Sequence, residues 1–321
     1  MSAKRGFLDR LLTFAFGDEA HPEGDRPSVG APMLSAWLPH RSYDSSTDTF
    51  YNAGSIGFIV EAAPMVGANE RTGDLWTQFL SDSVPSGCEF NALYFQSPSV
   101  GPKITDWILP RMLAKGVFAR AAEHRARWLR RGIWMSLSKD APFLLRQHRV
   151  FISISAPVNS AIDIHVLNTV RDALLTTLDA VGMPARKVTP VELIGLINEL
   201  LSPSSDNADK PSDYNPLDPI APQCVRRDLE TTIGEHRIVC HSDRFRPTGE
   251  EIDGVPVIGE VIPDKFDLRF FSVRNFPQRF APWDGQLLIG DPFNDKLRHR
   301  GNIFISVCLV FPDEEAANSK A

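Results

Sequence analysis

The chain has 321 residues, 43% hydrophobic and 23% charged, which is enough for two compact soluble domains with buried cores. Its formal net charge of −6 argues against a general nucleic-acid binder, because such proteins carry an excess of Lys and Arg. The four cysteines form no C-x-x-C pair, which excludes zinc-ribbon and thioredoxin-type motifs. No apolar run approaches the ~18 residues of a membrane span, and no signal peptide is recognisable. We therefore expect a cytoplasmic protein with reduced thiols.

The first 33 residues form a region of their own. Residues 4–16 predict a short amphipathic helix whose apolar side chains share one stripe, namely Phe7, Leu8, Leu11, Leu12 and Ala15. This helix either docks on its own domain or lies on a membrane surface or a partner. Residues 17–33 are acidic and rich in Pro and Gly, which is typical of a linker.

A first folded domain is predicted at 34–201, with strands and helices interleaved. The most specific local signals are the alternation of Ile56, Phe58 and Val60 in a hairpin, Asn69 as a helix cap, and Thr189-Pro190 as a helix start. Strands are expected at 49–51, 55–62, 90–95 and 148–156. Helices are expected after Asn69, at 104–131 as one helix or a broken pair, at about 160–181 and at about 189–201.

A second block follows a linker that is rich in Pro and Ser, at 202–224. The block at 225–312 predicts strands at 229–241, 255–262, 266–273, 286–289 and 302–311, and residues 313–321 form a tail. The expected class is therefore α+β, with mixed or antiparallel sheets and packed helices. The first block is helix-rich and the second is strand-rich.

The glycine-containing stretches fit no catalytic motif. No glycine begins the P-loop pattern G-x-x-x-x-G-K-[ST], and the nearest stretch, Gly101-Pro102-Lys103, loses a backbone donor to its proline. The stretch Gly54-Ser55-Ile56-Gly57 lacks the spacing of a nucleophile elbow and of a dinucleotide fingerprint, and it runs into a strand. Its glycines are expected to serve turn geometry. We predict no catalytic or cofactor-binding residue, and we expect that the chain is not an enzyme.

Metal binding is also not expected. His236 and Cys240 would share one face of a strand, whereas His241 points to the opposite face. A zinc site needs a third and a fourth ligand, and the sequence offers no obvious pair. We therefore predict no metal site.

Residues 111–131 carry the most unusual charge pattern, with seven cationic residues against one acid, Glu123. The cationic residues are Arg111, Lys115, Arg120, Arg125, Arg127, Arg130 and Arg131. This basic patch, in an acidic chain, is either a solvated helix face, a docking surface for anionic lipid or an acidic partner, or a nucleic-acid contact. We take it as the candidate docking patch.

Three ordered blocks of the sequence resemble the N-terminal part of the TraC-type conjugation ATPases of F-type type IV secretion systems. The first block, LPHRSYDSSTDTFYNAGSIGFIVEAAPMVGANE, spans residues 38–70. The family-signature residues in it are Leu38, Pro39, Arg41, Tyr43, Gly57, Phe58, Glu61 and Gly67. The second block is LRQHRVFISISAP and the third is LDPIAPQCV at 217–225.

The resemblance implies a docking and assembly role without chemistry of its own. Family members continue into a RecA-like motor with the P-loop, and this sequence stops before such a motor, so the resemblance transfers no catalytic residue and no nucleotide. It implies binding to inner-membrane components of the secretion channel, a separate motor domain or a second copy of the chain, at the cytoplasmic face of the inner membrane. Two alternatives remain open: an atypical nucleotide-binding enzyme, and a DNA-contacting module that uses the patch at 111–131.

Overall fold

The computed structural model describes residues 34–65, 67–138, 144–201, 213–225, 239–247, 251–252, 255–256, 259–267 and 302–312. The chain divides into two compact units. One, here called the sheet unit, comprises 43–189 and 277–321, and the other, the second unit, comprises 1–42 and 190–276. The predicted helix at 4–16, the strand at 286–289, residue His236 and the tail at 313–321 lie outside the described residues.

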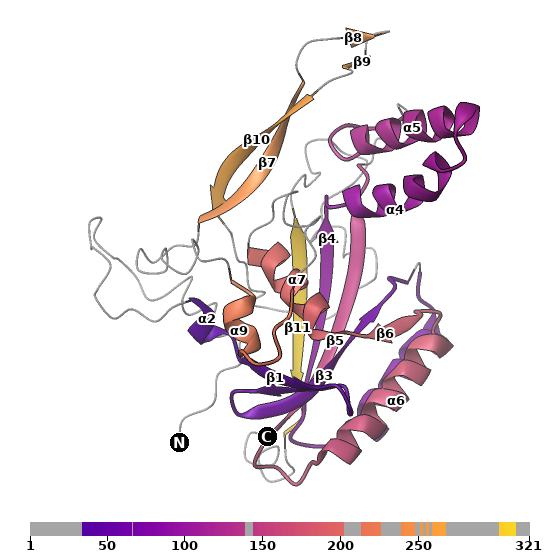
Figure 1. The fold of residues 1–321 in the computed structure, drawn as a ribbon. Helices are drawn as coiled ribbons and strands as arrows, with labels where there is room; N and C mark the ends of the chain where they lie inside the picture. Colours follow the sequence, from indigo (N-terminus) through magenta and orange to yellow (C-terminus); the bar gives the residue numbers. More distant parts are fainter. Residues whose placement is uncertain are drawn as a thin grey trace, which may run out of the picture. The chain divides into compact units, whose positions relative to one another are not determined.

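A seven-stranded antiparallel sheet organises the chain (Figure 1). Its strands are β1 (His40–Asp44), β2 (Thr49–Asn52), β3 (Ser55–Ala62), β4 (Glu89–Ser97), β5 (Gln147–Pro157), β6 (Ala185–Lys187) and β11 (Ile303–Val310). The spatial order is β1-β2-β3-β5-β4-β11, and β6 pairs with β3 beyond the end of β2. Together with the helices, this sheet confirms the predicted α+β class and the antiparallel pairing.

The central strands carry the alternating pattern that the sequence predicts. Ile56, Phe58 and Val60 of β3 are buried in one core cluster, and they lie opposite Ala156, Ile154 and Ile152 of β5. Period-two alternation places these side chains on one face of the sheet because successive residues of a strand point to opposite faces. The expectation that Ile56, Phe58 and Val60 face the core is confirmed.

Two helices complete this core. Helix α3 (Glu70–Asp82) begins at Asn69, whose side chain accepts a hydrogen bond from the Thr72 backbone in a capping box, as the sequence predicts. Helix α6 (Ile164–Ala180) begins at Asp163 and packs on β3, with α3 beside it. Its apolar stripe of Leu167, Val170, Leu174 and Leu178 is fully buried.

The segment between β4 and β5 forms a helical hairpin. Helix α4 (Gly101–Met112) and helix α5 (Gly116–Arg131) pack against each other, so the region predicted at 104–131 is a broken pair. The break lies at 113–115, because Pro110 is accommodated inside α4, while Lys115 and Gly116 adopt positive φ angles of 55° and 62°. Figure 1 shows the two helices side by side, with the connecting turn at the end away from β4.

The last strand of the chain belongs to the same sheet as the first strands. β11 pairs with β4 over its whole length, from Ile303 opposite Gln96 to Val310 opposite Glu89. Just beyond it, the Phe311 backbone exchanges hydrogen bonds with Gly87 and Cys88. Sequence patterning placed this strand in the block at 225–312. Its partner strand lies more than 200 residues earlier in the chain, and local signals do not encode such a long-range pairing.

The second unit contains short helices and two strand pairs. Helix α7 (Pro190–Leu201) starts at the predicted Thr189-Pro190 signal, and α9 (Ile220–Gln223) contacts both α7 and α2 (Leu34–Trp37). Strand β7 (Val239–Pro247) pairs antiparallel with β10 (Gly259–Asp267), and β8 (Glu251–Ile252) pairs with β9 (Val255–Pro256). Of the strand predicted at 229–241, residues 239–241 belong to β7, and residues 229–238 lie outside the described part of the chain.

Candidate docking surface

The first family-signature residues form the approach to the sheet. Leu38 is buried, and the Arg41 guanidinium donates a hydrogen bond of 3.1 Å to the Leu38 carbonyl. That hydrogen bond spans three residues directly after α2. Pro39 lies between its two ends and cannot donate a backbone hydrogen bond of its own. Leu38 and Arg41 therefore fix the direction in which the chain enters β1.

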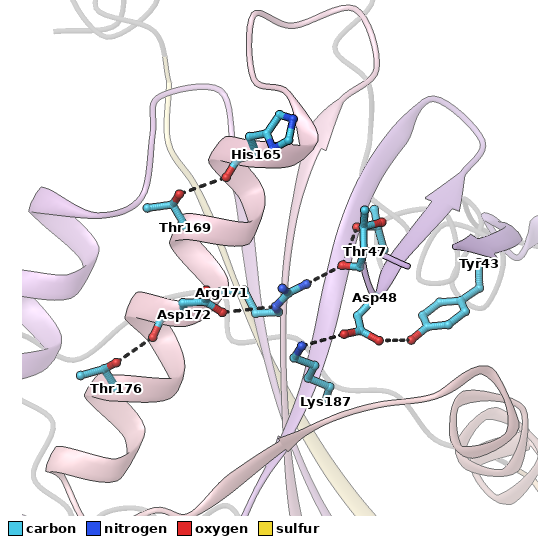
Figure 2. Close-up of polar contacts among 10 residues, drawn as sticks. Tyr43, Thr47, Asp48, His165, Thr169, Arg171, Asp172, Thr176 and Lys187 are labelled. Atoms are coloured by element: carbon cyan, nitrogen blue, oxygen red, sulfur yellow. Dashed lines mark hydrogen bonds and ion pairs between the residues drawn. The ribbon is translucent and has the colours of Figure 1, made fainter. Parts of the chain in front are cut away.

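Tyr43 belongs to a polar network at the turn between β1 and β2 (Figure 2). Its hydroxyl donates a 2.8 Å hydrogen bond to Asp48 Oδ1, and Lys187 Nζ of β6 lies 2.6 Å from Asp48 Oδ2. Arg171 of α6 donates a hydrogen bond of 2.6 Å to the Thr47 carbonyl. The turn is thus held from both a helix and a second strand, although Asp48 itself has a φ of 54°.

The charges of this network are matched. The hydrogen bond from Lys187 lowers the pKa of Asp48 below its ordinary value, against the opposing effect of burial. Burial, followed by the Asp48 carboxylate, raises the pKa of Tyr43 well above its ordinary range, so the phenol stays a hydrogen-bond donor. The network is therefore an ionised carboxylate held by a phenol and an ammonium group, which is an arrangement suited to fixing a turn.

Three further signature residues lie on β3 and after it. A Cβ added to Gly57 would lie 2.4 Å from the Ile154 carbonyl oxygen, so only glycine lets β3 and β5 approach there. Phe58 is in the core. Gly67 has a φ of +83°, which non-glycine residues rarely adopt.

Glu61 bridges two arginines on the sheet. One carboxylate oxygen lies 2.6 Å from Arg149 Nε of β5, and the other pairs with Arg186 of β6, the residue directly opposite Glu61. The side chains of Glu61 and Arg149 are only 14% and 15% exposed. Glu61 therefore links β5, β3 and β6 as a cross-strand ion pair, and in this arrangement its carboxylate is engaged on both oxygens.

A second polar contact between strands has no counterpart in the sequence predictions. Tyr94 of β4 and His148 of β5 stack with ring centroids 6.0 Å apart, and Tyr94 Oη lies 2.6 Å from His148 Nδ1. Burial, then the nearby Arg146 charge, lowers the pKa of His148, and burial raises the pKa of Tyr94. Both shifts favour the uncharged forms, so the short contact joins a neutral imidazole and a protonated phenol. The alternating strand pattern alone carries no signal for the pair.

The residues that the structure describes contain no group of three or more His, Cys, Asp or Glu placed to hold a metal ion. Burial raises the pKa of Cys88 to about 11 and that of Cys224 to about 12, so both thiols stay protonated near neutral pH. The side chains of Cys240 and His241 lie outside the described part of the chain, and the metal prediction there stays a prediction.

The predicted docking patch lies on the α4–α5 hairpin. Ala119, Ala122 and Ala126 are the buried side of α5, and their small side chains allow close packing against α4. Arg120, Arg127 and Arg131 follow at spacings of seven and four residues, which returns them to one side of the helix. Three of the seven cations therefore share one stripe of α5, of which Arg120 and Arg127 are exposed and Arg131 is half-buried.

The other cations surround that stripe with local contacts. The guanidinium of Arg111 lies 4.3 Å from the Trp107 ring and that of Arg125 lies 4.2 Å from the Trp128 ring. Arg127 forms an exposed ion pair with Glu123 at 2.8 Å, and Arg130 donates to Thr105 across the hairpin at 3.3 Å. Lys115 and Arg120 are exposed and have no ion pair with a described residue.

The turn of the hairpin also exposes apolar side chains that sequence patterning did not single out. Leu113 is 81% exposed, Phe118 78% and Val117 70%. With Leu109 and Met112 they form the apolar tip, a set that lies within ten residues of chain. The sequence does contain a signal for this group, because apolar residues cluster on both sides of Gly116. Helical periodicity alone assigns such residues to a buried helix face, so their exposure was not predicted.

No helix in the described ranges combines the length and the apolar character that crossing a bilayer requires.

Comparison with known proteins places the sequence. Residues 34–321 match the family described as "TraC protein". The chain is similar to "Protein TraC" of Escherichia coli (strain K12), with 24% identity over 216 residues. That similarity covers 63% of this chain and 24% of the relative, so the matched region spans about a quarter of the length of the curated relative.

Proposed function

Because this chain belongs to the TraC protein family, we propose that it is a docking and assembly domain of a conjugative pilus apparatus. It binds inner-membrane components of the type IV secretion channel at the cytoplasmic face, and it has no ATPase activity of its own. The α4–α5 hairpin is the docking element. The supporting observation is that exposed cations and exposed apolar side chains coincide there, in a chain with a net charge of −6.

The contrast with the sheet supports the choice of the hairpin. Glu61, Asp48 and their basic partners are engaged with one another and stabilise the turn and the strands. Lys115 and Arg120 protrude from the hairpin instead, where an acidic partner would meet little desolvation penalty in approaching them. Complementary charge of this kind raises association rates and selects partners more than it adds affinity.

The absence of ATPase activity is proposed from the sequence. A phosphate-binding loop needs consecutive backbone donors followed by Lys and Ser/Thr, and no such pattern is present. Titration of the chain with ATP and Mg²⁺ tests this part of the proposal, and micromolar binding or turnover would contradict it.

Membrane docking is tested with inverted inner-membrane vesicles from cells that carry the transfer apparatus and from cells that lack it. The chain is expected to co-float more strongly with the first set. The double variant Arg120→Gln/Arg125→Gln should lose most of that difference because two exposed cations of the hairpin are removed. Arg71→Glu changes the net charge by the same amount on the exposed side of α3, and it serves as the matched control.

Two results would contradict docking through the hairpin. One is equal flotation with both sets of vesicles, and the other is equal loss in the control and the double variant. The basic stripe also favours a second candidate, a DNA contact. Binding to duplex DNA that weakens steeply with salt, and that Arg120→Gln/Arg125→Gln reduces, would support that candidate instead.

A further inference from the structure

We propose that the apolar tip of the α4–α5 hairpin inserts into the interface of a bilayer that contains anionic lipid. The inference rests on the proposed function, because it names the surface that the docking hairpin meets. Its physical basis is the joint presence of apolar side chains at the turn and cations immediately behind them.

The apolar tip is the largest group of exposed apolar residues close in sequence that the described part of the chain contains. Five of the large exposed hydrophobic residues fall within ten positions: Leu109, Met112, Leu113, Val117 and Phe118. Of the remaining ones, three lie together on β11, and the other four are single positions, namely Val158, Val166, Val191 and Leu217. Scattered exposed apolar residues are normal on a soluble surface, whereas a concentrated group marks a contact surface.

The cations lie where lipid headgroups would be. Arg111 of α4, Lys115 in the turn and Arg120 of α5 lie within about one helical turn of the apolar side chains in the sequence. Apolar side chains that enter the acyl boundary place such flanking cations at the depth of the phosphates. Since the whole chain is acidic, attraction to an anionic surface has to come from this local group.

The arrangement of the tip favours a lipid surface over a groove on a protein. A helix that binds a groove presents one stripe at spacings of three, four and seven residues. Here the apolar side chains come from the end of α4, the turn and the first residues of α5, so they surround a chain reversal. A fluid bilayer interface accepts apolar side chains that project in several directions, and a preformed groove does not.

The test uses the full chain and protein-free vesicles of two compositions, phosphatidylcholine alone and phosphatidylcholine with phosphatidylglycerol. Sedimentation of the vesicles measures the bound fraction. Binding to the anionic vesicles should be at least about tenfold tighter, because several cations contribute near the surface. Leu113→Ser/Phe118→Ser should weaken binding to the anionic vesicles about tenfold or more, because the variant lacks two large apolar side chains whose transfer from water into the bilayer favours binding.

The matched control is Val158→Ser/Leu217→Ser, which removes two exposed apolar side chains outside the hairpin. This control should bind as the unchanged chain does. All four positions are more than half exposed, so both double variants should melt at the temperature of the unchanged chain. Thermal melting by circular dichroism verifies that both variants are folded.

Insertion is separated from simple headgroup attraction by an environment-sensitive fluorophore. The label is attached to Leu113→Cys in a chain whose Cys240 and Cys308 are replaced by Ser. Its emission should shift to the blue with anionic vesicles, while a label at Leu217→Cys should not shift. Absence of the shift, or equal binding by the tip variant and the control, overturns insertion.

The two flotation and sedimentation experiments together distinguish failure of lipid insertion from failure of docking on channel components. If the chain fails to bind protein-free anionic vesicles but still co-floats with vesicles that carry the transfer apparatus, the lipid inference is overturned and protein docking stands. If it binds protein-free vesicles and gains nothing from the apparatus, lipid insertion stands and docking on channel components fails.

Discussion

The sheet and the α4–α5 hairpin use arginine and lysine in opposite ways. On the sheet, Arg149 and Arg186 share the Glu61 carboxylate, and Lys187 meets Asp48. On the hairpin, Arg120 is exposed without an ion pair to a described residue. Burial explains the pairing of Arg149 with Glu61, whose side chains are 15% and 14% exposed, since a cation removed from water has to be matched by a carboxylate or a carbonyl. Arg186 and Lys187 are more exposed and pair with carboxylates that the sheet and its turn hold in place.

The apolar residues of the two regions differ in the same sense. Phe58 and Val60 lie at the centre of the core beneath α6, whereas Phe118 and Leu113 are mostly solvated at the hairpin turn. The sheet therefore supplies the free energy of folding, and the hairpin presents side chains that folding does not need. Substitutions should accordingly lower stability in the first region and change surface binding in the second.

The largest expected effect follows from Gly57→Ala. The added Cβ would meet the Ile154 carbonyl oxygen at 2.4 Å, and that oxygen belongs to backbone that cannot rotate away. We expect a loss of about 3 kcal/mol or more in the free energy of unfolding, or failure to fold. Urea denaturation followed by circular dichroism measures it.

Gly73→Ala is the matched control for that prediction. Gly73 lies inside α3 and its added Cβ would have nothing within 4 Å, so alanine should stabilise the helix by about 0.5–1 kcal/mol. If both variants destabilise the chain equally, the close approach of β3 and β5 is not the cause.

Glu61→Ala should have the next largest effect. The substitution removes the carboxylate shared by Arg149 and Arg186 in a site of low exposure, and we expect a loss of about 2 kcal/mol. Glu123→Ala removes the partner of Arg127 on the hairpin. The side chains of Glu123 and Arg127 are 50% and 55% exposed. That control should change stability by less than about 0.5 kcal/mol, and a similar loss in both variants would erase the contrast between the two regions.

Local sequence signals predicted the elements better than their partners. The alternation in β3, the Asn69 cap and the Thr189-Pro190 helix start are encoded within a few residues, and all three are confirmed. The pairing of β11 with β4 is not encoded locally, because any strand with an apolar face fits many edges. The block boundary at 202–224 therefore did not reveal that the end of the chain returns to the first sheet.

The polar sites show the same limit. The signature pattern identified Tyr43 and Glu61, but their partners Asp48, Lys187, Arg149 and Arg186 are set by strand register and by the turn. The basic patch was visible as composition, whereas the apolar tip was not. Exposure depends on which neighbours fail to pack, and that is a property of the whole fold.

A smaller effect on the free energy of unfolding is expected from the turn network around Asp48, and it should depend on pH. The pKa of Asp48 is lowered in the folded chain, mainly by Lys187, relative to about 3.9 in an unfolded chain. Its contribution is therefore complete above that unfolded value and is lost as the pH falls through the lower native value. Because Lys187 is partly exposed, we expect only about 0.5–1 kcal/mol.

Asp48→Asn isolates this charge. Asparagine tolerates the φ of 54° and retains an acceptor for the Tyr43 hydroxyl, while the ion pair and the hydrogen bond with Lys187 are lost because the amide nitrogen is a donor. The difference in unfolding free energy between the two chains should be present at pH 7 and should narrow as the pH falls below 4. A difference that stays constant down to pH 2 would show that the charge is not responsible.

The smallest effect is expected from Lys115→Gly at the hairpin turn, and its sign is opposite. Lys115 has φ 55° and ψ −179°, a conformation that glycine adopts readily and other residues adopt at a cost. Glycine should relieve that strain and raise the free energy of unfolding by up to about 1 kcal/mol, less the entropy that glycine adds to the unfolded chain. Lys115→Ala removes the same charge without relieving the backbone and should give no gain.

Both variants should weaken binding to anionic vesicles equally, since each removes one cation from the turn. A stability gain that only the glycine variant shows, with equal losses in binding, would mean that the hairpin keeps Lys115 at the turn at the expense of stability. None of the cations described on the sheet has a positive φ angle. If Lys115→Gly destabilises the chain, the strain assigned to this turn is wrong.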